Sequence, residues 1–70
     1  MKTKAEVLFE IDSAINAHLY MLRHHKDRWR ISRSHDWDLT TATHQTAIHE
    51  RVSAMKYLKR IRKAVEMMED

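Results

Sequence analysis

The stretch SRSHDWD, residues 32–38, separates two long helical patterns and decides how this chain folds. Its serine and aspartate side chains compete with helical backbone hydrogen bonds and favour turns and helix N-caps. The chain has no glycine and no proline, the residues on which hairpins and compact loops usually depend. We therefore predict a single reversal here, with Asp38 or Thr40 as the N-cap of the helix that follows.

Before this stretch, the sequence predicts one long amphipathic helix over about residues 4–31. Thr3-Lys4-Ala5-Glu6 matches a capping box, in which a threonine hydroxyl accepts from a backbone amide three residues on. Apolar and histidine residues then recur at alternating spacings of three and four, which places them on one side of a helix. This first seam consists of Leu8, Ile11, Ile15, His18, Leu22, His25 and Trp29.

After the stretch, a second periodic pattern predicts a helix of similar length over about residues 39–68. Its seam residues alternate spacings of four and three. They are Ala47, Arg51, Ala54, Leu58, Ile61, Val65 and Met68.

Two helices joined by a short turn pack as an antiparallel hairpin, so we expect one all-α domain over residues 1–70. If the turn is centred near Asp36, facing residues have numbers that sum to about 72. His18 is then expected opposite Ala54, and His25 opposite Ala47. Each apolar stripe is wider than a two-stranded seam requires, which favours a homodimer that forms a four-helix bundle.

Size and composition agree with a small helical protein that needs a partner. A chain of 70 residues buries only about 60% of the surface that its unfolded form exposes. It has no cysteine, and 43% of its residues are hydrophobic and 33% charged, so it should fold without disulfides. Neither a signal peptide nor a membrane span is indicated, and we expect a cytoplasmic protein with no membrane contact.

Sequence signatures of enzymes are missing. The chain has no glycine-rich phosphate loop, no HExxH zinc motif and no cysteine nucleophile. A short hairpin also offers no deep pocket of the kind that catalysis usually needs. We expect no catalytic residue and no cofactor.

Three histidines, His18, His25 and His44, project toward the expected seam, and His25 and His44 are expected to approach each other across it. Neutral imidazole is the commonest metal ligand in proteins, but a structural zinc site needs four ligands. No fourth group is evident, so we expect no metal site. If burial keeps the seam histidines neutral, acidification should loosen the bundle.

Basic residues suggest two binding surfaces on a chain whose formal net charge is +3. One is a helix face whose basic residues lie three, four and seven positions after the first of them, and which an acidic or nucleic-acid partner could contact. Such a face is also compatible with a merely solvated surface. We call it the basic face, and it consists of Lys56, Lys59, Arg60 and Lys63.

The other candidate surface surrounds the reversal, where arginine and aromatic side chains are interleaved. These residue types are enriched at protein interfaces and also stack on bases. Trp29 falls in the seam and is expected to be buried there, whereas Trp37 either covers the helix ends or stays free for a partner. We call this surface the tip, and it consists of Arg28, Arg30, Arg33, His35 and Trp37.

These features predict a small non-enzymatic helical interaction protein, a regulator or inhibitor that binds a macromolecular partner through the tip and the basic face. The alternative is a four-helix dimer that binds RNA or DNA directly. Phe9 and Tyr20, on the outer side of the first helix, point to a further contact surface, in the dimer or with a partner.

Overall fold

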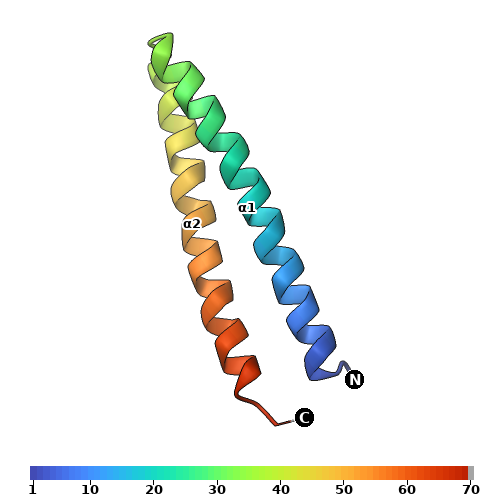
Figure 1. The fold of residues 1–70 in the computed structure, drawn as a ribbon. Helices are drawn as coiled ribbons and strands as arrows, with labels where there is room; N and C mark the ends of the chain where they lie inside the picture. The colour runs from blue at the N-terminus through green and yellow to red at the C-terminus, as the bar shows by residue number, and fades with distance from the viewer. Residues whose placement is uncertain (70) are drawn as a thin grey trace.

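The computed structural model describes residues 1–69, and these form two long helices without a strand. Helix α1 spans Lys4–Ser34 and helix α2 spans Asp38–Glu66. They lie side by side and antiparallel, so that both termini are at the same end of a rod of 52 × 15 × 14 Å (Figure 1). The predicted all-helical hairpin is therefore observed. Neither helix has an apolar stretch long enough to cross a membrane.

Helix α1 begins where the capping box predicts. The backbone amide of Glu6 donates to Thr3 Oγ1 at 3.2 Å, which satisfies one of the free amides of the first turn. The second half of the box differs, because the Thr3 hydroxyl itself donates to the Glu6 carboxylate.

The reversal is tighter than predicted and contains a Schellman motif. The amide of Trp37 donates to the carbonyl of Ser32 at 2.9 Å, and the amide of Asp36 donates to the carbonyl of Arg33 at 3.2 Å. This pairing requires a left-handed residue at the position after the helix C-cap, where glycine is usual. Asp36 takes that position with φ of 58°, since aspartate tolerates this region better than most residues.

The predicted end of the first helix is wrong by three residues. Helix α1 continues past Ile31 to Ser34, and Ser32 is almost fully buried at 1% exposure. Ser32 Oγ donates to the carbonyl of Arg28 at 2.8 Å and accepts from Thr41 Oγ1 at 3.2 Å. A hydroxyl that is satisfied in this way fits inside the helix pair, so its polarity did not end the helix.

The predicted caps of the second helix are also wrong. Trp37 is the N-cap of α2 and its side chain makes no capping hydrogen bond, while Asp38 is already helical. The Schellman turn occupies only three residues, and α2 begins immediately after it. At the other end, α2 stops at Glu66, so Met68 lies outside the helix and is exposed instead of lying in the seam.

The end of α2 is held by a side chain from α1. Lys4 Nζ donates to the carbonyls of Glu66 and Met68 at 2.7 and 2.8 Å. An ammonium group at a helix C-terminus satisfies free carbonyls and complements the helix dipole. The open end of the hairpin is thus closed by a polar contact.

The core of the hairpin is thin. Ile11 and Leu22 are its buried hydrophobic residues among those described, and α2 has no buried residue. The other predicted seam residues, apart from Met68, are half-buried between the helices. The seam prediction is correct in position, but one hairpin covers its own apolar stripes only in part.

Candidate functional site

Polar side chains from the two helices meet at the middle of the seam and again nearer the turn. Arg51 approaches His18 with 2.9 Å between Arg51 Nη1 and His18 Nδ1. His25 and His44 are 3.0 Å apart between their Nδ1 atoms. The expected approach of His25 and His44 is confirmed.

The structure shows the polar partners of two histidines for which an alanine was expected opposite. His18 pairs with Arg51, one turn from Ala54, and His25 pairs with His44, one turn from Ala47. In both cases the observed partner lies about one helical turn nearer the reversal. Hydrogen bonding explains this choice, since a half-buried imidazole nitrogen needs a polar partner and alanine offers none.

The His25–His44 pair lies in an environment that disfavours positive charge. The pKa of His25 lies below its ordinary value, first because burial removes solvent from the ring and then because His44, His24 and Arg51 add positive charge nearby. His25 therefore favours the neutral form. The expected loosening of the structure at acid pH stays a prediction.

The tip is a solvent-exposed group of basic and aromatic side chains. All five predicted tip residues are exposed, and no ion pair among residues 1–69 includes any of them. The imidazole of His35 stacks on the indole of Trp37, with ring centroids 4.8 Å apart and an interplanar angle of 25°. Trp37 is 54% exposed, so it does not cover the helix ends.

Trp29 is half-buried, in agreement with its predicted seam position. The guanidinium carbon of Arg33 lies 5.1 Å from the centre of its ring, which is within cation–π range. One tip arginine is therefore partly engaged within the chain. Arg28 and Arg30 project from other sides of α1 at 100° per residue, so the three arginines do not line one track.

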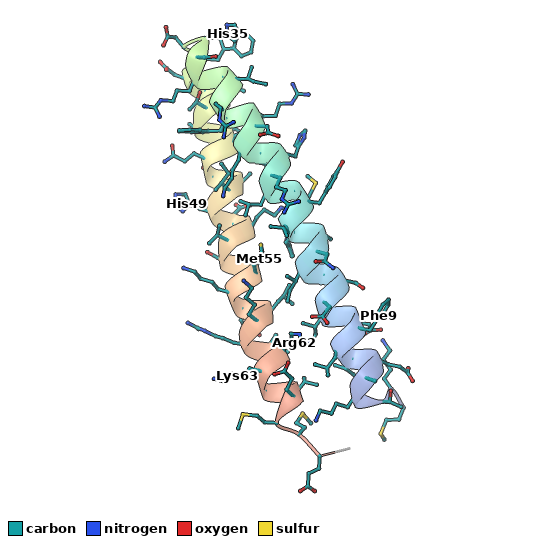
Figure 2. All side chains as sticks on the ribbon, viewed as in Figure 1. Phe9, His35, His49, Met55, Arg62 and Lys63 are labelled. Carbon is teal, nitrogen blue, oxygen red and sulfur yellow. The ribbon has the colours of Figure 1, made fainter. Side chains whose placement is uncertain are left out.

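All four residues of the basic face are exposed on α2. Figure 2 shows Lys63, and His49 nearer the turn, on the side of α2 that faces away from α1. No ion pair within the described part of the chain involves these four cations. The basic face is separate from the tip, since Lys56 lies 18 residues beyond the start of α2, or about 27 Å along the helix.

A third surface is apolar and lies on the side of the hairpin marked by an ion pair between the helices. Arg62 Nε donates to Asp12 Oδ1 at 2.6 Å. Residues seven positions apart share one side of a helix, so Leu19 lies on the side of Asp12, and Met55 and Ile48 on the side of Arg62. We call Leu19, Ile48 and Met55 the apolar face, and all three are half-buried.

Phe9 and Tyr20 are 71% and 73% exposed, in agreement with their predicted outer position. Figure 2 shows Phe9 pointing away from α2.

No known protein family, curated protein or solved structure matches this chain. Its function is therefore inferred from the three surfaces of the hairpin, which are the tip, the basic face and the apolar face.

Two polar contacts across the seam were not predicted from the sequence. Arg51 is part of the second periodic pattern, and a cation inside an apolar stripe was a signal that it needs a partner there. The Asp12–Arg62 pair had a weaker signal, since both residues lie beside the seam and not in it. Only the observed register, in which paired residue numbers sum to 69 to 74, brings them together.

Proposed function

We propose that this protein is a small, non-enzymatic helical protein that binds a macromolecular partner and thereby regulates or inhibits it. The tip and the basic face are its binding surfaces, and occupancy of the partner's surface is its mechanism. A second copy of the chain covers its apolar face in a four-helix homodimer. We place this activity in the cytoplasm.

The position of Trp37 is the observation that carries the proposal of partner binding. It is the N-cap of α2, where serine or aspartate would add a capping hydrogen bond of about 1 kcal/mol. Trp37 makes no such bond and leaves more than half of its surface in solvent. A residue that stabilises its helix poorly and is of a type enriched in binding hot spots favours a role in recognition.

The charge of both surfaces favours an acidic protein as the partner. Cations that are not neutralised within the hairpin attract a surface of opposite charge, which accelerates association and selects among partners. The exposed side chains of the basic face and of the tip meet this description. Asp27, Asp36 and Asp38 lie near the tip but form no ion pair with it.

Direct binding of RNA or DNA is the second candidate, favoured by the exposed ring of Trp37 beside arginines. Bases stack on such rings, and arginines contact phosphates. The scattered directions of the tip arginines favour the protein partner, because a phosphate backbone requires a continuous track.

The proposal of a homodimer rests on exposed area. A folded monomer of 8.4 kDa has an accessible surface of about 4600 Å² by the usual scaling with mass, whereas the hairpin exposes 5793 Å². The excess of about 1200 Å² is larger than the roughly 800 Å² that each partner buries in a standard interface. A second hairpin on the apolar face would remove this excess.

Charge reversal tests the role of the basic face. The double variant Lys59→Glu with Arg60→Glu should lose the partner captured from the native host, because both exposed cations become anions. Arg23→Glu with Lys26→Glu changes the net charge equally on exposed residues of α1 and should retain it. Circular dichroism establishes that each variant is folded. Capture of the same partner by both variants would contradict the assignment of the basic face.

The same proteins distinguish the two kinds of partner. Nonspecific duplex DNA and a structured RNA are titrated across a salt series, because binding led by phosphates weakens steeply as salt rises. The proposed function predicts no measurable binding at low salt. Tight binding that decreases with salt and is lost in the Lys59/Arg60 variant would support the second candidate.

A further inference from the structure

The side chains of His25 and His44 form a contact between helices that the proposed function does not use. His25 comes from α1 and His44 from α2, and their Nδ1 atoms face each other at 3.0 Å. The ring centroids are 5.2 Å apart and the rings are inclined by 44°. Both side chains are half-buried, so water and small ions reach them.

We propose that His25 and His44 bind one divalent transition metal ion of the copper(II) or nickel(II) class through their Nδ1 atoms, as a clamp between α1 and α2. A metal–nitrogen bond of about 2.0–2.1 Å places two cis ligands at a right angle about 2.9 Å apart. A tetrahedral angle requires about 3.3–3.4 Å with the same bonds. The observed 3.0 Å is that of a hydrogen bond between the two rings, and it is close to the spacing of two cis ligands on copper(II) or nickel(II). A bound ion would replace this hydrogen bond.

The pair would supply two protein ligands to the ion. In residues 1–69, no group of three or more His, Cys, Asp and Glu side chains has metal-binding geometry. Water molecules would complete the coordination at the exposed side of the rings. The sequence predicts no metal site, because a structural zinc site needs four ligands. An open site with two imidazoles and water needs fewer protein ligands.

The charges around the pair affect its affinity for a metal. The pKa of His25 lies below its ordinary value, mainly because of burial, which favours the neutral ring that offers a lone pair to a metal. Arg51 contributes positive charge to the same surroundings and weakens the binding of a cation.

A metal at this position would stabilise the half of the hairpin whose seam is polar. The two ligands are 19 residues apart in the chain, and unfolding separates them. An ion that binds the folded form more tightly raises its stability in proportion to the logarithm of the ion concentration. Small domains commonly gain stability from a metal in this way.

The test uses the tag-free full chain at neutral pH, titrated with Ni²⁺ and separately with Cu²⁺. Calorimetry should give one metal ion per chain, and the unfolding temperature from circular dichroism should rise with metal concentration and return to its initial value with a chelator. His44→Ala should lower the affinity at least about tenfold, since even loss of a group that only orients a metal ligand costs about that much. It should also abolish the rise in unfolding temperature.

His49→Ala is the matched control, since His49 also lies on α2 but is exposed on its outer side. This variant should bind the metal and gain stability like the unchanged protein. His25→Ala repeats the test from α1, in case His44→Ala fails to fold. Equal metal-dependent stabilisation of the His44→Ala and His49→Ala proteins, or no stabilisation of the unchanged chain, would overturn the proposal.

Discussion

At the scale of single residues, Asp36 determines how a chain without glycine reverses its direction. Its φ of 58° allows the Schellman hydrogen bonds that end α1, and only Trp37 then remains before α2 begins. A left-handed conformation costs ordinary residues roughly 1–2 kcal/mol, and aspartate less. The reversal thus depends on a residue that tolerates this conformation without being ideal for it.

Two different substitutions of Asp36 should change the free energy of unfolding in opposite directions. We expect Asp36→Gly to raise the free energy of unfolding by about 0.5–1 kcal/mol, since glycine adopts positive φ freely. Asp36→Val should lower it by about 1–2 kcal/mol, because a β-branched residue is disfavoured at this angle. Urea denaturation followed by circular dichroism measures both effects. A valine variant as stable as the unchanged protein would show that the left-handed turn does not form.

At the scale of the two helices, an ion pair fixes one side of their contact. The Arg62 guanidinium holds the pKa of Asp12 below its ordinary value, mainly through the hydrogen bond between them. A carboxyl group whose pKa is lowered by folding stabilises the fold at any pH above its pKa in the unfolded chain, here about 3.8. This stabilisation is lost as the pH falls through the lower pKa of the folded protein. The contribution is small because both side chains are partly exposed.

Asp12→Asn should therefore destabilise the protein at neutral pH but not at strongly acid pH. The measurement is the difference in unfolding temperature between the variant and the unchanged chain, taken from pH 7 to below pH 3.8. Because other carboxyl groups titrate equally in both proteins, the difference reports on Asp12. A difference that stays constant over this range would show that the ion pair does not contribute.

The elements were more predictable from the sequence than their contacts. The capping box and the two periodic patterns located the helices, because a buried helix side repeats every three to four residues. The reversal was placed too early because Ser32 reads as a turn residue, whereas its hydroxyl is satisfied inside the helix pair. The partners of His18 and His25 depend on register, and a shift of one helical turn leaves the apolar pattern unchanged.

The candidate surfaces were predictable in part, for a related reason. Charged and aromatic residues outside the seam had to be exposed, and all nine residues assigned to the tip and the basic face are exposed. The approach of His25 and His44 was expected from the sequence, but not the contact between their Nδ1 atoms at 3.0 Å or the uncapped position of Trp37. Both depend on how α1 ends and on how tightly the chain turns.

At the scale of the whole molecule, the hairpin is a rod with too little interior. Its shape leaves most seam residues half-buried, and two buried hydrophobic side chains in the described chain provide little stabilisation against the entropy of ordering it. A second copy would bury the apolar face and also place two tips and two basic faces on one particle. The proposed dimer is central, because it would supply the buried area that one hairpin lacks and would determine how the binding surfaces are presented.

Sedimentation equilibrium at micromolar concentration, in a chelator to exclude metal, tests the proposed dimer most directly. We predict a mass twice that of the 8.4 kDa chain. Met55→Glu, on the apolar face, should shift the mass toward the monomer, while Tyr57→Glu, at a residue 65% exposed on the same helix, should leave the dimer intact. A well-folded monomer of the unchanged chain at this concentration would contradict the account.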